Sequence, residues 1–226
     1  ALGRVFTVTL DADNASYAIQ MHGTVDGGLP SINFTSAGYN FVGGNASWAG
    51  FSTPANDDSR DLLLTPMVNG QSAGTINANA NQGGVGGGAT IGAGEAMRVD
   101  FVVDLAGAPV NGGSFAQPAN QTQSFDRHYS VNGSTSVISI TGGGSASVQI
   151  KAFEDADTPP LHVVGDGVQD TISLVSIRLG SVQQLVSVNL GGSQTVSVGG
   201  NSVSVTFDAS GSVTVKHEPL PSSLCT

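Results

Sequence analysis

The sequence predicts an all-β fold, an antiparallel β-sandwich, and three observations favour it. Charged residues make up only 11% of the 226 residues, while 32 are glycine. This composition is typical of many short strands joined by turns, and not of helices with charged outer faces. Apolar and polar residues alternate in many short runs, and no run keeps a 3.6-residue apolar period beside good helix formers. A hydrophobic content of 39% is enough for a packed core.

The strands expected in the first half begin with a hairpin. Residues 4–10 (RVFTVTL) and 16–22 (SYAIQMH) flank the turn DADNA, whose Asp and Asn residues favour tight turns. Residues 62–65 are predicted as a short apolar strand. Residues 97–105 (MRVDFVVDL) are the strongest strand candidate of this half.

The second half is predicted to be a run of strands with Gly-rich turns. Residues 137–140 and 146–153 are expected to pair as a hairpin around TGGGS. Two polar segments that contain Pro and Gly, 106–124 and 155–168, are long enough to be loops that carry function. The other predicted strands are 171–179, 185–190, 194–198, 202–207 and 212–217.

The chain is expected to be one module over residues 1–226, which could be subdivided near the DTPP segment at 157–160. Cys225 is the single cysteine, so neither an internal disulfide nor a thiolate metal cluster is expected. The chain does not begin with Met, has no signal-peptide core and has no apolar run long enough to span a membrane. We therefore expect a soluble module of a larger chain, without membrane insertion.

The charge excludes several classes of function. Acidic residues number 17 against 7 Lys and Arg, so the formal net charge is −10. Nucleic-acid binding needs a basic footprint, which the sequence lacks, and anionic membrane surfaces are disfavoured for the same reason. The four histidines are scattered, and neither a HExxH pair nor a G-x-S-x-G motif occurs. Neither a zinc site nor an enzyme is expected.

Aspartates gather in two segments, NDDSRD at 56–61 and KAFEDADTPPLHVVGDGVQD at 151–170, and FDRHY adds another acidic residue. Neighbouring carboxylates repel unless solvent, an arginine or a cation neutralises them. Ca²⁺ prefers oxygen ligands, so these segments favour Ca²⁺ binding over simple solvated turns. The EF-hand spacing is absent. The candidate metal ligands are Asp57, Asp58, Asp61, Glu95, Asp126, Asp155, Asp157 and Asp166.

A Gly-rich stretch, GVGGGA at 84–89, matches the dinucleotide pattern G-x-G-x-x-G/A. That pattern requires a helix after it, and here two more glycines and a strand follow, so nucleotide binding is not expected. One interpretation is a wide surface loop in which glycine supplies the turns. The other is a loop whose carbonyls, with Asn77, Asn79, Asn81 and Glu95, face a cation.

Three segments within residues 52–105 together resemble a known family. NDDSRDLLLTP, TINANANQGGVGGG and IGAGEAMRVDFV are similar to segments of the peptide-binding β-sandwich module of large bacterial RTX adhesins. A looser match extends over 124–180. The resemblance implies a β-sandwich with Ca²⁺-binding loops, in which the ion helps to hold a short ligand such as a peptide terminus.

The resemblance also implies roles for individual positions. Asp57, Asp58 and Asp61 would fill an Asp-rich turn, Glu95 would close the site, and Asp100 would lie on the following strand. The stretch GVGGGATIGAG has more glycines than the family pattern, which leaves the class of ligand open. The central ligand-binding loop would contain Asn77, Asn79, Gly83, Gly84 and Gly86.

The predicted function is a Ca²⁺-dependent module of an extracellular bacterial adhesin that binds a peptide or protein on a target cell surface, for attachment or biofilm formation. A carbohydrate-binding domain is the nearest alternative, with Trp48 and Tyr39 as the rings that would stack on a sugar. A structural spacer domain, in which Ca²⁺ only stiffens the fold, is the third.

Overall fold

The computed structural model describes most of the chain between residues 44 and 218, together with the backbone of an N-terminal hairpin. All its strand pairs are antiparallel, so the all-β prediction is confirmed. The described residues contain one 3-10 turn, Pro118–Asn120, and no helix that could cross a lipid bilayer. Backbone alone is described at 6–11, 16–21 and 218, and side chains as well at 44–52, 58–79, 82–131, 133–139, 145–157 and 163–217.

The N-terminal hairpin has the strands that the sequence predicts. Strand β1 (Phe6–Asp11) pairs with β2 (Ser16–Met21) in a register that runs from Phe6↔Met21 to Asp11↔Ser16. The alternation of apolar and polar residues in both segments accounts for the pairing.

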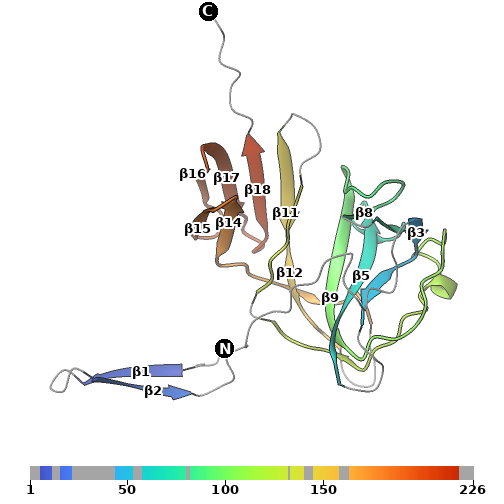
Figure 1. Cartoon of the computed structure of the whole chain (residues 1–226), viewed down its shortest axis with the longest axis horizontal. Coiled ribbons are helices and arrows are strands. Elements are labelled where there is room, and N and C mark those ends of the chain that lie inside the picture. Colours follow the sequence, from blue (N-terminus) through green and yellow to red (C-terminus); the bar gives the residue numbers. More distant parts are fainter. Residues whose placement is uncertain are drawn as a thin grey trace, which may run out of the picture.

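Beyond this hairpin, the described residues from 44 to 128 form two sheets (Figure 1). The larger has the order β10-β9-β5-β4, and β6 pairs with β5 at one end. The smaller has the order β3-β7-β8. The strands are β3 (Gly44–Ala46), β4 (Ala49–Phe51), β5 (Arg60–Val68), β6 (Gln71–Ser72), β7 (Ile76–Ala78), β8 (Gly83–Val85), β9 (Glu95–Val103) and β10 (Arg127–His128).

The ladder between β5 and β9 is the longest in this half. It runs from Arg60↔Val103 to Val68↔Glu95 over nine residue pairs. We call the end at Arg60 and Val103 the acidic end, and the end at Val68 and Glu95 the glycine end. The sequence predicted both strands, although it placed β5 only at 62–65 and β9 two residues too late.

The two faces of this ladder pack against different partners. Directly paired residues share a face, so Leu63 and Asp100 lie on one side. This side, called the Trp48 face, carries a core with Trp48, Val102 and Phe125. The other side packs against Ile76 and Val85 of the smaller sheet, which therefore covers it. The apolar residues on both sides explain why this half remains folded as two layers.

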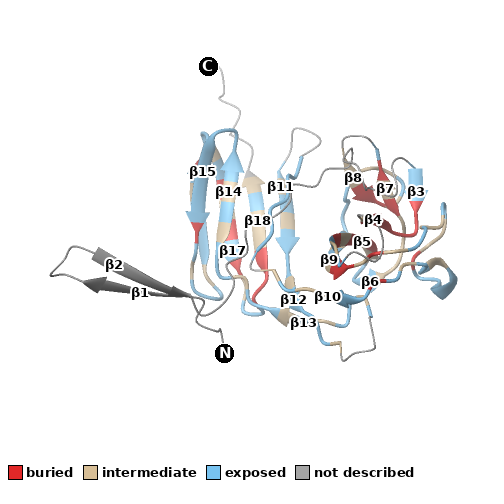
Figure 2. Cartoon of the chain, turned by 60° about the horizontal axis from the view of Figure 1, so that its bottom comes forward, coloured by how far each residue is buried: buried red, intermediate tan, exposed pale blue. Residues whose placement is uncertain are grey.

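The second half contains a four-stranded sheet with the order β11-β18-β17-β16 and two short strand pairs. Valines alternate along β17 and β18. Val205, Phe207 and Val213 of these two strands form a buried core with Val186 of β15 (Figure 2). The strands are β11 (Ala146–Ile150), β12 (Ala152–Glu154), β13 (Val168–Asp170), β14 (Val175–Leu179), β15 (Val182–Val186), β16 (Ser193–Val198), β17 (Asn201–Phe207) and β18 (Val213–Glu218).

Two strand predictions for this half are wrong. Residues 133–139 form no strand, and β11 pairs with β18 rather than with a neighbour across TGGGS. The predicted strand at 185–190 is shifted, because β15 ends at Val186 and pairs with β14 through a tight turn. The strands predicted at 194–198, 202–207 and 212–217 are confirmed to within one residue.

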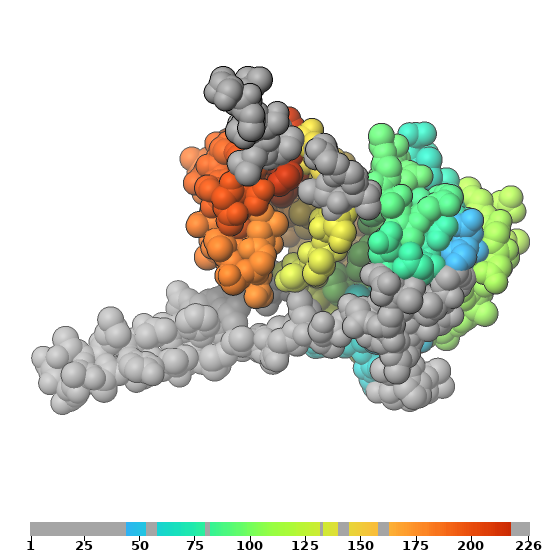
Figure 3. Space-filling model, turned by 45° about the horizontal axis from the view of Figure 1, so that its top comes forward, coloured from blue at the N-terminus to red at the C-terminus, as the bar shows by residue number. Residues whose placement is uncertain are grey.

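The two halves have separate cores and are joined by the segment around β12 and β13. Figure 3 shows the C-terminal half in orange and red apart from the green first half, with yellow residues between them. Val164, in the loop between β12 and β13, packs on the core of the Trp48 face. The subdivision was predicted near residues 157–160, of which 158–160 lie outside the described residues.

Candidate metal centre

Three aspartates meet at the acidic end of the ladder. Asp58 precedes β5, Asp104 follows β9 and Asp126 precedes β10. One carboxylate oxygen from each lies within 4.8 Å of the other two. We call this group the aspartate cluster. Asp58 and Asp126 are among the metal ligands predicted from the sequence, and Asp104 is not.

Backbone geometry holds this cluster together. Asp58 and Asp104 adopt left-handed conformations, with φ of 53° and 55°, so the chain turns sharply at both. The Asp104 N–H donates to the Ser59 carbonyl, and the Asp126 N–H donates to the Val103 carbonyl. Three separate segments are therefore fixed side by side with their carboxylates close together.

Arg127 lies beside the aspartate cluster. Arg127 Nη1 lies 3.8 Å from Asp58 Oδ1, and both side chains are largely exposed. Exposed pairs of this kind contribute little to stability. The cluster brings three carboxylates together, and carboxylate oxygens are ligands that a divalent cation such as Ca²⁺ prefers.

Asp61 has a different role from the one predicted. Its side chain is buried, and its carboxylate accepts hydrogen bonds from Ser59 Oγ and from the Leu105 N–H, the latter at 2.8 Å. These bonds tie the start of β5 to the chain beyond β9, so Asp61 supports the turn and does not join the aspartate cluster. Asp57 lies outside the described residues.

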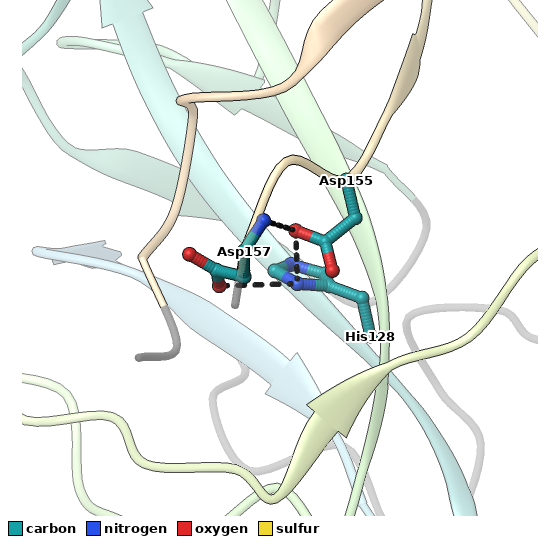
Figure 4. Close-up of side chains that lie close together, drawn as sticks. All are labelled: His128, Asp155 and Asp157. Atoms are coloured by element: carbon teal, nitrogen blue, oxygen red, sulfur yellow. Dashed lines mark hydrogen bonds and ion pairs between the residues drawn. The ribbon is translucent and has the colours of Figure 1, made fainter. Parts of the chain in front are cut away.

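A second group, the histidine cluster, lies on the Trp48 face. It consists of His128 on β10 with Asp155 and Asp157, which follow β12 (Figure 4). His128 Nδ1 is 3.3 Å from Asp155 Oδ1 and 3.8 Å from Asp157 Oδ2. Asp155 and Asp157 were predicted as ligands, but Asp166, their expected companion, is exposed and belongs to neither cluster of the described residues.

The other ring nitrogen of His128 faces the sheet. Nε2 lies 3.7 Å from Asp100 Oδ1, and the ring stands edge-on to Phe125 with centroids 4.9 Å apart. The pKa of His128 is raised above its usual value. The Asp100 carboxylate is the largest cause, burial of the ring acts in the opposite direction, and the charges of Asp155 and Asp157 raise the pKa further. No sequence motif marks this histidine, because its partners come from distant strands.

The Gly-rich loop lies at the glycine end, where it folds back on itself. The Val85 N–H donates to the Thr90 carbonyl, and a Cβ at Gly84 would lie 2.0 Å from Thr90 N. Gly86 has φ of 79°, and a Cβ there would lie 2.6 Å from Glu95 Oε1. Gly84 is therefore required by its close approach to the Thr90 backbone, and Gly86 by its left-handed backbone conformation.

Glu95 does not close a site with the Asp-rich turn. The ladder places Glu95 opposite Val68, and Asp61 opposite Val102, seven residue pairs away. At about 3.4 Å per residue, the two positions are roughly 24 Å apart along the strands. Glu95 Oε2 instead accepts a hydrogen bond of 2.7 Å from the Gly92 N–H. One ion cannot bind to both ends, so this part of the prediction is wrong.

The predicted ligand-binding residues near Glu95 mostly serve the loop itself. Asn77 Nδ2 donates to Asn45 Oδ1 at 2.7 Å, and Asn79 Oδ1 accepts from the Gln82 N–H. Gly83 lies in β8. The glycine end of the ladder is far from the aspartate cluster. An ion bound by the aspartate cluster therefore cannot also touch a ligand held by Asn77, Asn79 or Gly83.

Trp48 is not available to stack on a sugar. Its side chain is completely buried, and Nε1 donates to Thr122 Oγ1 at 3.1 Å. The indole fills the core of the Trp48 face, where its N–H needs a partner. Tyr39, the second predicted ring, lies outside the described residues.

Comparison with protein-family models, curated proteins and solved structures gave no match. Among the described residues, two clusters have side chains that could bind a metal ion. The aspartate cluster offers only carboxylate oxygens, while the histidine cluster combines two carboxylates with an imidazole nitrogen. The first set suits hard cations, and the second suits transition metals.

Proposed function

We propose that this chain is a non-catalytic, Ca²⁺-stabilised β-sandwich module of an extracellular adhesin that binds a peptide or protein ligand. The aspartate cluster is the observation that carries this proposal, since three separate segments bring their carboxylates within 4.8 Å of one another. The ligand class rests on the resemblance to RTX adhesin modules. Membership of a larger, secreted chain rests on the same resemblance.

The chemistry of the cluster fits Ca²⁺ better than other ions. Ca²⁺ takes six to eight oxygen ligands in flexible geometry. Three carboxylates supply three to six of them, and waters complete the shell at an exposed edge. Extracellular Ca²⁺ is abundant, so a weak site of this kind is occupied there, and binding to the folded state adds stability by mass action.

The position of the cluster makes Ca²⁺ a structural element in this proposal. It joins the segments before β5, after β9 and before β10, so the ion would hold the acidic end of the sheet closed. The predicted ligand loop lies at the glycine end. The ion would therefore act on ligand binding through the fold and would not touch the ligand.

Thermal unfolding in EDTA and in millimolar Ca²⁺ tests the ion. We expect Ca²⁺ to raise the Tm of the wild-type chain and of the control Asp166→Asn. We expect Asp104→Asn to lose most of that increase, because it removes one of the three charges. An identical Tm with and without Ca²⁺ would refute the proposal.

Peptide and glycan arrays in Ca²⁺ separate the three functional hypotheses. Binding to peptides is expected. Glycan binding alone would favour the carbohydrate-binding alternative, for which Trp48 can no longer serve as the stacking ring. A Ca²⁺-dependent Tm with no array binding would favour the structural spacer.

A further inference from the structure

The histidine cluster carries more negative charge than its one histidine can offset. Asp100, Asp155 and Asp157 surround the imidazole, and their side chains are 13%, 35% and 7% exposed. Within the described residues, His128 is the only cationic group in ion-pair contact with any of them. Asp100 and Asp157 are the least exposed of the three; charges with so little contact with water need compensation, and a single imidazolium can neutralise only one.

Two polar atoms at the cluster are buried without a hydrogen-bond partner. They are Nδ1 of His128 and Oδ2 of Asp100. Nδ1 points at the carboxylates of Asp155 and Asp157, but with hydrogen-bond geometry to neither (Figure 4). Buried polar atoms almost always have partners, and a bound ion is one of the few explanations for an exception.

The three facing atoms lie within 4.8 Å of one another, and the two distances from Nδ1 are close to those expected around a small metal ion. Zinc binds nitrogen and carboxylate oxygen at about 2.0–2.2 Å, so tetrahedral ligand atoms lie about 3.3–3.6 Å apart. The separations from Nδ1 to the two carboxylates are 3.3 and 3.8 Å. Three protein ligands leave a fourth position for water, as in open zinc sites.

Neighbouring groups already orient these ligands. The Asp157 N–H donates to Asp155 Oδ1, and the Val163 N–H donates to Asp157 Oδ2 at 2.7 Å. Asp100 faces the second ring nitrogen of His128. A carboxylate on the far nitrogen is the usual partner of a metal-binding histidine, because it holds the ring and strengthens the ligand.

We propose that His128, Asp155 and Asp157 bind one divalent transition metal of the Zn²⁺ type, with Asp100 as a positioning residue. The nitrogen ligand separates this site from the all-oxygen aspartate cluster, because imidazole favours zinc-like ions over Ca²⁺. The metal would cross-link the segment after β12 to β10, and would thereby hold the second half of the chain against the Trp48 face. The proposal is independent of Ca²⁺ binding.

Calorimetric titration of the EDTA-stripped full chain with ZnCl₂ tests it. We expect one Zn²⁺ per chain and a higher Tm in its presence. His128→Gln should abolish this binding, and the matched control His217→Gln, on β18, should retain it. Asp155→Asn, whose side chain is the most exposed of the three, should weaken binding at least about tenfold while the chain remains folded.

The role of Asp100 has its own readout. Asp100→Asn should weaken Zn²⁺ binding about tenfold and leave the Ca²⁺ affinity unchanged. Absence of Zn²⁺ binding, or binding that survives in both His128→Gln and Asp155→Asn, would overturn the proposal. A separate Ca²⁺ titration of Asp104→Asn reports on the aspartate cluster alone, so failure of one site is distinguishable from failure of the other.

Discussion

The two ends of the β5–β9 ladder both place acidic residues beside sharp turns, yet the carboxylates are in opposite situations. At the glycine end, Glu95 is held by the Gly92 N–H and fits where Gly86 has no side chain. At the acidic end, the carboxylates of Asp58, Asp104 and Asp126 face one another. Glu95 is thus bound within its own loop, whereas the three aspartates come from separate segments of the chain. Convergence from separate segments is the better sign of a metal site.

The largest expected effect is at the glycine end. Gly84→Ala should lower the free energy of unfolding by about 3 kcal/mol, because its Cβ would overlap the Thr90 backbone. Gly87→Ala is the control, since nothing lies within 4 Å of a Cβ there. Urea denaturation measures both variants. Equal losses would mean that the loop does not fold back as described.

Asp61 gives the next largest effect, at the acidic end. Asp61→Asn should cost about 1–3 kcal/mol, because the buried carboxylate accepts from the Leu105 N–H and from Ser59 Oγ. The exposed Asp58→Asn, measured by urea denaturation in EDTA, should cost nothing. If Asp58→Asn is as damaging as Asp61→Asn, the division of roles between these two aspartates is wrong.

A matched pair of alanine substitutions compares the two ends directly. Glu95→Ala should lower stability by about 1 kcal/mol, because the Gly92 N–H loses its acceptor. Asp126→Ala in EDTA should instead raise the free energy of unfolding by about 0.3 kcal/mol, since it relieves repulsion between like charges. Chemical denaturation of both in parallel would detect the opposite signs.

Asp208, in the second half, provides the smallest effect and a reference for a carboxylate bound by hydroxyls. Hydrogen bonds from Ser210 and then Ser212 lower its pKa from 3.8 to about 2. A lowered pKa in the folded state adds stability above pH 4, which is lost as the pH falls toward 2. The difference in free energy of unfolding between wild type and Asp208→Asn should therefore shrink toward zero as the pH falls from 4 to 2. A difference that stays constant between pH 5 and pH 2 would contradict this assignment.

Local patterns in the sequence predicted the strands but not all their partners. β5 and β9 were expected because apolar residues crowd both segments. The partner of β11 was missed, since TGGGS favours a local hairpin, whereas β18 offers a longer alternating strand from far along the chain. Pairings of this kind depend on packing, which no short motif encodes.

The candidate sites were predicted in the same uneven way. Asp126, Asp155 and Asp157 stood out because they lie in acidic segments, and each belongs to a cluster. Asp104 is a single aspartate after a strand, and His128 lies far in sequence from its partners. The β5–β9 ladder places Asp104 beside the segment that carries Asp58, and the register of β10 on β9 places His128 opposite Val102.

The position of β18 has a consequence for the order of folding. This last described strand lies inside its sheet, between β11 and β17, and not at an edge. As the chain is synthesised, β11 must wait for residues more than sixty positions later before it can pair. Contacts this distant in sequence slow folding, so we expect β11 to pair with β18 after the local hairpins of the C-terminal half have formed.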